Sequence, residues 1–336
     1  MFKYFLKRLG LAVLILLGVS LIIYVLVRCM PVSFIEGKIA EMNQGGATIP
    51  EEPVERMKKL YGLEDDSFVG ILKGYVNWLG KLVQFDFGTS FKYGAPVIDV
   101  IRDHMGVSFA IAFVAVILEF LIAIPLGITA ATHQYTARDY VVTILVMIGI
   151  SLPAFFFGQV LKDLFANKLG WFPPSGMTDA SQSYTGVYLL LDYLKHMFIP
   201  VVTVVILSIG GRMRMTRTNM LEVMSSDYIR PARAKGLSER VVVYKHAFRN
   251  TLIPLVTSLA GLLPSLFSGA IITEQVFDLP GIGNVAYKAM IVADIPFIMG
   301  YNMFLALLSV LGVLLADLMY AVVAPRVKLT CYGKEV

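Results

Sequence analysis

Six long apolar runs, separated by polar segments, dominate the pattern of this chain of 336 residues. Such runs approach the roughly 20 apolar residues that a helix needs to cross about 30 Å of hydrocarbon. The fourth run is the shortest, and we expect its helix to extend further at its inner end. The pattern predicts an all-α polytopic membrane protein with six transmembrane helices at Leu9–Val27, Val107–Thr132, Tyr140–Leu161, Met197–Gly211, Leu252–Thr273 and Phe297–Ala324.

The first apolar run follows a basic start that contains Lys3, Lys7 and Arg8. A secretory signal peptide has the same order of charge and apolar residues, but this run is long for one and no small-residue cleavage site follows it. We therefore predict that residues 1–31 form a cytoplasmic N-terminal segment and an uncleaved first transmembrane helix.

Residues 32–103 form a long polar region that then lies outside the cell membrane. Apolar residues recur in this region at helical spacing, so it is predicted to be folded rather than disordered. On periodicity alone, a small decorative loop domain is the better interpretation. The predicted helical stripes are Val54, Met57 and Leu60, closed by Gly62, and then Phe68, Ile71, Leu72, Tyr75, Leu79 and Leu82.

The segment 212–250 is the most basic part of the chain. Between Arg212 and Arg249, nine Lys or Arg residues face three Asp or Glu residues, which gives this stretch a net charge of +6. A charge at the bilayer centre costs about 2.5–3.5 kcal/mol or more, so the segment is expected in water. Positive loops remain in the cytoplasm, which places this segment and, with six spans, both termini on that side.

The overall composition fits a membrane protein and argues against a nucleic-acid-binding one. Hydrophobic residues make up 57% of the chain, and the formal net charge is +5. The positive charge comes largely from the basic segment and the N-terminus, without a basic groove interleaved with aromatic residues. Cys29 and Cys331 are predicted on opposite faces of the membrane, so we expect no disulfide between them.

The basic segment is predicted to form two short helices around a bend. Ser225, Ser226 and Asp227 favour the start of the first helix, and Gly236 suits the left-handed conformation that ends one. Ser238 then favours the start of the second helix. Two sets of residues are predicted to lie on one side of a helix each: Tyr228, Ile229, Ala232 and Lys235 on the first helix, and Val241, Tyr244, Phe248 and Leu252 on the second.

Two interpretations of this bend are open from its residues alone. One is a solvated, positively charged loop, which is the better expectation for an arbitrary membrane protein. The other is a docking surface, because the small side chains of Ala232, Ala234 and Gly236 would let another protein approach closely, with Arg230 and Lys235 beside them.

Two consecutive sequences in this segment resemble a known family. The run Asp-Tyr-Ile-Arg-Pro-Ala-Arg-Ala-Lys-Gly-Leu-Ser-Glu-Arg (227–240) and the following His-Ala-Phe-Arg-Asn (246–250) resemble the cytoplasmic coupling loop of ABC importer permeases, most closely those of the dipeptide, oligopeptide and nickel group. Pro231 departs from the family pattern, which usually has Thr there. The resemblance implies an ATPase-coupling site at Asp227, Tyr228, Arg230, Ala232, Arg233, Ala234, Lys235, Gly236, Leu237, Ser238 and Glu239.

Three outer segments also resemble this group of permeases. They are Asp-Phe-Gly-Thr-Ser (86–90), Glu-Gln-Val-Phe (274–277) with Pro-Gly-Ile-Gly (280–283), and Asp-Ile-Pro (294–296). The glycines of the second segment match a relaxed dinucleotide fingerprint, but they follow a membrane run instead of a strand. In the family, the external segment that corresponds to residues 86–90 sits near the incoming binding protein and substrate, and the other two segments resemble the outer loop between the last two spans.

Two carboxylates fall inside predicted spans and are candidates for function. Glu119 lies mid-way along the second span and Asp317 lies in the sixth. Intramembrane carboxylates serve as proton relays, line a polar path, or hold helices together as neutral or paired groups. Both kinds of role remain open for Glu119 as a translocation-path candidate, whereas the position of Asp317 favours a structural role.

The resemblance implies a type I ABC importer permease-like fold that forms half of a translocation pathway. The implied partners are a second homologous permease, cytoplasmic ATPase subunits that bind ATP and Mg²⁺, an extracytoplasmic substrate-binding protein and a peptide substrate. No cofactor, metal or catalytic residue is expected on this chain itself, and the implied location is a bacterial or archaeal inner membrane. Nickel or glutathione as cargo, or an ion-coupled secondary carrier, are the alternatives. The predicted divisions are 1–31, the extracytoplasmic helical insertion 32–103, the five-helix core 104–325 with its coupling loop 212–250, and the cytoplasmic tail 326–336.

Overall fold

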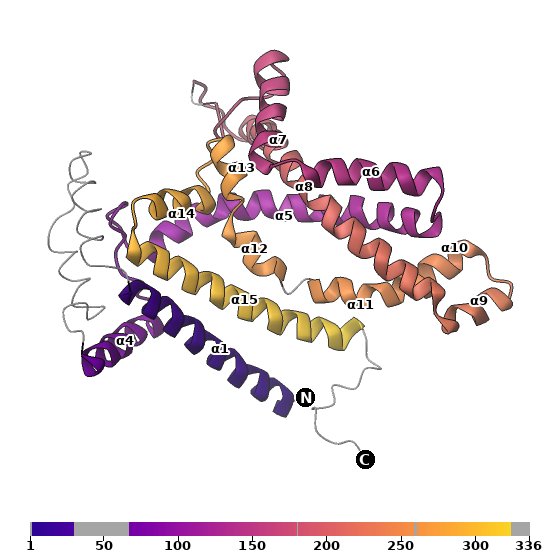
Figure 1. Ribbon diagram of the computed structural model, residues 1–336. Coiled ribbons are helices and arrows are strands. Elements are labelled where there is room, and N and C mark those ends of the chain that lie inside the picture. The colour runs from indigo at the N-terminus through magenta and orange to yellow at the C-terminus, as the bar shows by residue number, and fades with distance from the viewer. Residues whose placement is uncertain (1, 30–66, 180, 259–260, 324–336) are drawn as a thin grey trace. The chain divides into compact units, whose positions relative to one another are not determined.

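A computed structural model of the chain describes residues 2–29, 67–179, 181–258 and 261–323 (Figure 1). Within these ranges the chain folds into helices and connecting loops, with an isolated antiparallel bridge between Thr89 and Pro96. The prediction of an all-α protein is confirmed. The predicted stripe from Val54 to Leu60 lies outside the described residues.

Four helices are long and apolar enough to cross a membrane, by length and composition. A fifth crossing is possible if α6 and α7, together with η1, the π-helical continuation of α7, form one span. The chain bends by 101° between α6 and α7. The predicted count of six transmembrane helices is not confirmed by the part of the chain that the structure describes. The four long helices are α1 (Phe2–Arg28), α5 (Val97–Thr132), α8 (Val187–Ser225) and α15 (Ile295–Val323), and the bent pair consists of α6 (Ala137–Ser151), α7 (Ala154–Leu161) and η1 (Lys162–Lys168).

The third predicted span, Tyr140–Leu161, is broken at a proline. Leu152 leaves the helical region, with φ −88° and ψ 133°, and Pro153 caps the next helix. Proline has no N–H to donate and disfavours helical geometry in the residue before it, so α6 ends here. By contrast, Pro125 lies inside α5, which continues through it.

The fifth predicted span, Leu252–Thr273, is also wrong as one continuous helix. Gly269 separates its last two pieces with φ 74° and ψ 154°, a conformation that is essentially restricted to glycine. This run therefore forms short helices in place of one rod: α11 (Phe248–Ser258), α12 (Leu262–Ser268) and α13 (Ile271–Val276).

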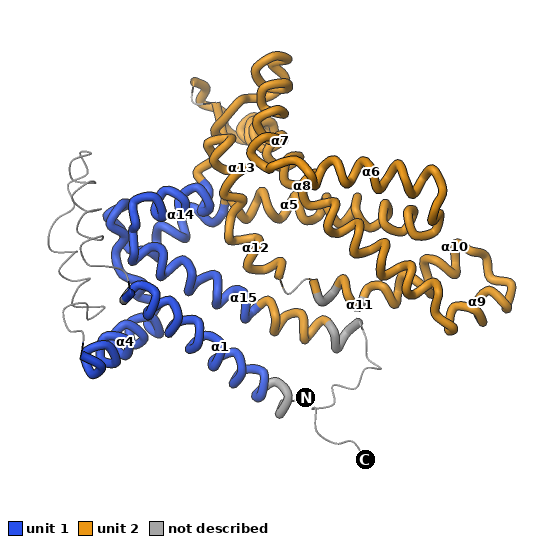
Figure 2. The backbone as a smooth tube through the Cα atoms, in the orientation of Figure 1, with its two compact units in different colours: residues 1–106, 281–311 blue, residues 107–280, 312–336 orange. Residues whose placement is uncertain are grey.

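The chain divides into two compact units (Figure 2). Unit 1 comprises residues 1–106 and 281–311, and unit 2 comprises residues 107–280 and 312–336. Unit 1 contains α1, the first part of α5 and much of α15, together with α4 (Phe68–Val83) and α14 (Ile282–Ile291).

In unit 1, α4 packs against α1 through a face that overlaps the predicted one in part. Gly70, Gly74 and Trp78, which are spaced four residues apart, are buried, whereas Phe68 and Leu72 of the predicted stripe are exposed. Glycines at two of these three positions let the helices approach closely, and Trp78 then stacks on Tyr24 with ring centroids 6.0 Å apart. The predicted helix is confirmed. Its packed face includes Ile71, Tyr75 and Leu82 of the predicted stripe, and it extends to the glycines and Trp78.

In unit 2, α8 packs against α6 and, at a close approach, against α5. A Cβ atom added to Gly127 of α5 would lie 2.7 Å from the Cβ of Thr216 on α8. Small residues at such crossings allow backbones to come together in a membrane bundle. The crossing holds the C-terminal part of α5 against the part of α8 in which the basic segment begins.

Candidate functional site

The basic segment begins inside a helix. The helix of the fourth predicted span was expected to extend beyond Gly211, and α8 continues to Ser225, through the first part of the segment 212–250. The hydroxyl groups of Ser225 and Ser226 both donate to the carbonyl oxygen of Glu222, at 2.8 Å and 3.0 Å, so they close the end of α8 instead of capping the next helix. Sequence analysis placed Arg212 in water because an unpaired charge is costly in the bilayer, but Arg212 pairs with Glu119.

The predicted bend is present between two short helices. The first is preceded by a 3-10 turn, η2 (Asp227–Ile229), and is α9 (Arg230–Ala234), with Pro231 in its first turn. Gly236 follows with φ +71°, the left-handed conformation that its sequence position predicted. The second is α10 (Glu239–Val241), which leads into the π-helical turn η3 (Val242–Ala247).

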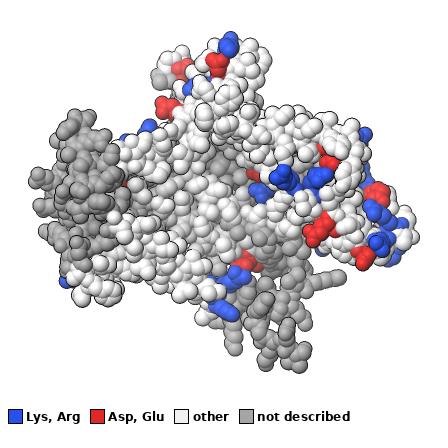
Figure 3. Space-filling model, viewed as in Figure 1, with Lys and Arg blue, Asp and Glu red and all other residues white. Residues whose placement is uncertain are grey.

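An ion pair closes the bend from one helix to the other. Arg233 Nε lies 2.8 Å from Glu239 Oε1, and Arg230 NH1 lies 3.4 Å from Asp227 Oδ1. All four side chains are largely exposed, so these pairs contribute little to stability. They do fix the relative orientation of charges that sequence analysis left free, and Figure 3 shows Lys and Arg side by side with Asp and Glu over α9 and α10.

The inner side of the bend rests on a buried apolar cluster, which we call the base cluster. Ile229 is fully buried and Ala232 is 7% exposed. Ala232 was expected to face a partner protein, but its methyl group instead packs inside this chain. The base cluster consists of Ile128 and Ala131 of α5, Met220 of α8, and Ile229, Ala232, Val242, Val243 and Ala247.

The predicted face of the second helix is wrong in its first part, where the π-helical turn lies, whereas Phe248 packs against the base cluster as predicted. Val242, Val243 and Ala247 are buried, whereas Val241 and Tyr244 of the predicted stripe are exposed. A π turn places an extra residue in its hydrogen-bonded ring, which shifts the helical phase relative to a regular α-helix. Because of this shift, Val242, Val243 and Ala247 face the base cluster at positions that regular α-helical spacing does not predict.

The outer side of the bend is a compact exposed surface. Ala234, Lys235 and Gly236 are exposed, together with Leu237, and Tyr228 is 52% exposed. We call residues 234–237 the exposed turn. Of the three small residues predicted to allow close contact, Ala234 and Gly236 lie on this surface and Ala232 does not.

A second candidate site lies between α5 and α8. Glu119 is 7% exposed, and its Oε1 accepts a hydrogen bond from Arg212 Nε at 3.0 Å. The same guanidinium donates to Ser258 Oγ at 2.6 Å and lies 4.4 Å above the ring of Phe120. The sequence singled out Glu119, but it assigned Arg212 to a loop 93 residues away in the chain.

A third charge pair links α6 to α8 and was missed by sequence analysis. Arg217 donates two parallel hydrogen bonds to Asp139, at 2.9 Å and 2.8 Å, and Asp139 is 4% exposed. Bidentate pairs of this kind hold geometry as well as charge. The sequence showed only that Asp139 is an acidic residue in the first turn of a membrane helix. The positive end of the helix dipole already explains an acidic residue there, so the sequence did not indicate a partner.

In unit 1, two of the outer segments meet at a buried carboxylate. Asp294 is fully buried, and its Oδ2 accepts hydrogen bonds from Ser90 Oγ at 2.5 Å and from the backbone N–H of Lys92 at 3.0 Å. The N–H of Phe297 lies 3.3 Å from its other oxygen. Burial, reinforced by this carboxylate, raises the pKa of Tyr93 to about 12.

Replacement of Asp294 by alanine is expected to destabilise unit 1. The hydroxyl group of Ser90 and the N–H groups of Lys92 and Phe297 would lose their acceptor, and each buried unsatisfied group costs about 1–3 kcal/mol. Thermal unfolding of the purified full chain measures the effect. Asp103→Ala, at a side chain that is 68% exposed, is the matched control and should stay within about 0.5 kcal/mol of wild type. Equal stability of the two variants would contradict this account.

A polar pocket of about 730 Å³ lies beside the start of α8 in unit 2. Its Asp192 carboxylate accepts a hydrogen bond from the N–H of Asp179 at 2.8 Å and lies 3.2 Å from His196 Nδ1. The Asp192 carboxylate is thus already engaged by groups of the chain itself, so we assign no ligand to the pocket. Across the described residues, no group of three or more His, Cys, Asp or Glu side chains is arranged to hold a metal ion.

Comparison with known proteins identifies several similar chains. The family described as binding-protein-dependent transport system inner membrane component matches residues 123–329. The oligopeptide transport system permease protein AppB of Bacillus subtilis (strain 168) is 34% identical over 98% of this chain and 100% of its own length. The dipeptide transport system permease protein DppB of Alkalihalophilus pseudofirmus is 30% identical, with the same coverage of both chains.

One solved structure shares the fold. It is a chain of the MetNI methionine ABC transporter in an inward facing conformation, with a TM-score of 0.52 and 16% sequence identity. The match covers 68% of this chain and 97% of that one. The type I importer permease-like fold that the sequence predicted is thereby confirmed.

Proposed function

The chain belongs to the family of inner membrane components of binding-protein-dependent transport systems, and we propose that it is a permease subunit of an ATP-driven importer of di- and oligopeptides. It forms half of the translocation pathway, and a second homologous permease forms the other half. ATP is hydrolysed on separate ATPase subunits, and an extracytoplasmic binding protein delivers the peptide. Nickel or glutathione are the alternative cargoes.

The exposed turn on its buried base is the observation that carries this proposal. A surface loop without a partner needs no rigid support, yet Ile229 and Ala232 fix α9 to the ends of α5 and α8. Close-packed apolar contacts transmit displacement because they cannot be compressed. Movement of the exposed turn by an ATPase subunit would therefore move Ile128 of α5 and Met220 of α8 with it.

Peptide uptake by reconstituted vesicles tests the function directly. The full chain is assembled with its second permease, ATPase subunits and binding protein, and uptake of a labelled tripeptide is measured beside labelled glutathione and Ni²⁺. We expect ATP-dependent uptake of the tripeptide that requires every component. Uptake driven by a proton gradient in vesicles without the ATPase subunits would support a secondary carrier and contradict the proposal.

The orientation of the chain gives a separate prediction. We expect a reporter fused after Gly88 to lie outside the membrane and one fused after Gly236 to lie in the cytoplasm, because positively charged segments remain inside. Alkaline phosphatase and green fluorescent protein fusions report these two locations. Finding both fusion points on the same side of the membrane would contradict the topology.

A further inference from the structure

One arginine of unit 2 has no acidic partner among the described residues, although it belongs to a candidate membrane span. Arg214 lies in α8 between Arg212 and Arg217, whose charges are both paired. In the described part of the chain, its guanidinium group has a single polar contact, at 3.8 Å from the sulfur atom of Met147. A guanidinium group is always charged and a thioether is a weak acceptor, so this contact does not balance the charge of Arg214.

The depth of Arg214 follows from the contacts that α8 makes on either side of it. Arg212 is level with Glu119, which lies mid-way along the second predicted span. At about 1.5 Å per residue, Met147 is about 10 Å along α6 from Tyr140, where the third predicted span begins. The guanidinium group beside Met147 therefore lies at the level of a membrane span. A charge at this depth is costly unless water or an opposite charge reaches it.

Arg214 belongs to a row of exposed polar and small residues on α8, which we call the polar stripe. Its members are three or four residues apart, so they share one side of the helix. On the opposite side, Met213, Thr216 and Met220 are buried against α5. A Cβ atom added to Gly211 would meet no atom within 4 Å, so there is room beside the stripe. The polar stripe consists of Gly211, Arg214, Thr218, Glu222 and Ser225.

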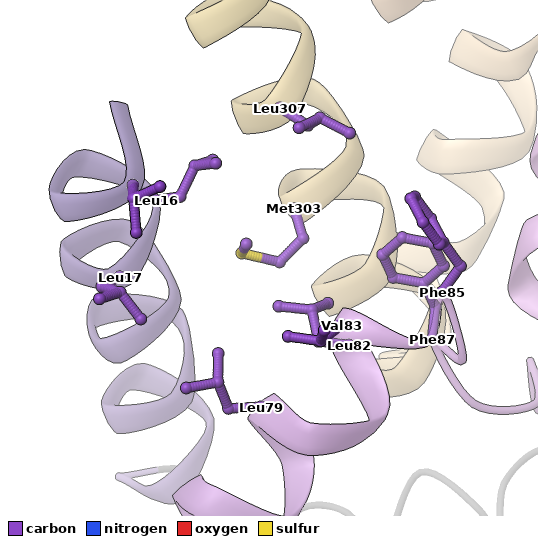
Figure 4. A pocket seen from close by; sticks show the side chains of 10 residues that line it. Leu16, Leu17, Leu79, Leu82, Val83, Phe85, Phe87, Met303 and Leu307 are labelled. Carbon is purple, nitrogen blue, oxygen red and sulfur yellow. The ribbon is translucent and has the colours of Figure 1, made fainter. Parts of the chain in front are cut away.

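Other exposed surfaces of the two units are apolar. On α6, every exposed residue from Val141 to Ile148 is apolar, and these side chains are 55% to 65% exposed. In unit 1, a groove of about 260 Å³ between α1, α4 and α15 is lined by apolar side chains such as Leu16 and Met303, and it offers nothing to a charged ligand (Figure 4). A charged side chain within a span faces the interior of a bundle or a water-filled cavity. The polar stripe, and not the apolar face of α6, is therefore the exposed side of unit 2 that suits an aqueous path.

We propose that the polar stripe lines the translocation pathway and that Arg214 binds the C-terminal carboxylate of the peptide as it passes. This inference rests on the proposed function, since it takes a peptide as the cargo. The parallel N–H groups of a guanidinium match the two oxygens of a carboxylate, which makes arginine a specific ligand for it. Every linear peptide carries this carboxylate whatever its side chains are, so one contact serves cargo of varied sequence. Glu119, the path candidate of the sequence, is engaged by Arg212, whereas Arg214 is left available.

Uptake of a matched pair of peptides tests this contact. The assembled transporter in vesicles receives a labelled tripeptide or the same tripeptide with a C-terminal amide, each at a concentration that saturates the binding protein. We expect Arg214→Gln to lower uptake of the free acid about tenfold, the lower end of what a hydrogen bond to a charged group contributes, and to leave uptake of the amide at its wild-type rate. Arg138→Gln is the matched control, because Arg138 is exposed at the start of α6, contacts the ring of His133 at 3.1 Å and lies outside the polar stripe. This control should carry both peptides as wild type does.

The outcomes separate this contact from other roles of Arg214. If Arg214 binds a lipid phosphate or an acidic group of the second permease, Arg214→Gln lowers uptake of the acid and the amide equally. Equal loss of both peptides, or loss of neither, would overturn the inference and leave the proposed function intact. A wild-type complex that takes up no peptide at all would contradict the proposed function instead.

Photolabelling locates the contact in the wild-type chain, so it decides the question even if Arg214→Gln fails to assemble. Two tripeptides carry a photoreactive methionine, one at the third residue and one at the first, and each is illuminated during ATP-driven uptake. The third residue bears the C-terminal carboxylate, so we expect its probe to label Met147 and the polar stripe, and the first-residue probe to label them less. Absence of label at these residues from the third-residue probe, in vesicles that take up the peptide, would overturn the inference.

Discussion

Gly236→Val is expected to abolish most peptide uptake while the protein still inserts and accumulates normally. Gly236 has φ +71°, and a left-handed backbone costs a residue with a Cβ about 1–2 kcal/mol, more for a β-branched one. The turn between α9 and α10 can relieve this strain only by changing its path, which moves the exposed turn off its base. Uptake, substrate-stimulated ATP hydrolysis and co-purification of the ATPase subunits should therefore fall together.

Gly236→Asn separates backbone strain from the loss of glycine itself. Asparagine adopts the left-handed conformation more readily than other residues, and no atom lies within 4 Å of the position that a Cβ would occupy at Gly236. We expect this variant to transport at close to the wild-type rate. Normal uptake by well-expressed Gly236→Val would show that the turn conformation has no part in coupling.

Glu119→Gln is expected to destabilise the transporter, because it leaves the positive charge of Arg212 without its partner. The variant keeps Arg212 in the bundle without its carboxylate, and breaking a buried ion pair from one side costs about 3–5 kcal/mol. Thermal unfolding of the purified chain and peptide uptake should both decrease.

The double variant Glu119→Gln with Arg212→Gln distinguishes a structural pair from a proton site. If the two charges serve each other, removing both restores much of the stability and uptake lost in the single variant. If Glu119 instead carries protons, uptake stays low in the double variant and loses its dependence on the proton gradient. We expect restoration, and failure to restore uptake in a stably folded double variant would favour the carrier.

The helices could be predicted from the sequence more reliably than the faces that they bury. Apolar length identified α1, α5, α8 and α15, because a span must be long whatever it packs against. The break after Leu152 follows from a proline that was visible in the sequence. Its effect could not be predicted, since Pro125 in α5 leaves that helix continuous.

The sequence did not indicate which charged residues pair with each other across the helices. Arg212 was assigned to water because an unpaired charge is costly in a membrane, and its partner Glu119 lies 93 residues earlier. Likewise, Ala232 and Ala234 are two residues apart and chemically identical, yet one is buried in the base cluster and the other is exposed. Only the three-dimensional contact decides which of them a partner protein can reach.

Site-directed cross-linking to the ATPase tests the central claim most directly. Ala234→Cys and Ala232→Cys are made in a chain whose two native cysteines, Cys29 and Cys331, are replaced by serine. In the assembled transporter, a short bifunctional thiol reagent and a panel of single cysteines along the ATPase surface are used. We predict that Ala234→Cys cross-links to the ATPase in a way that changes with ATP, while Ala232→Cys does not. Cross-linking of Ala232→Cys but not Ala234→Cys, or of neither in an actively transporting complex, would contradict a coupling role for the exposed turn.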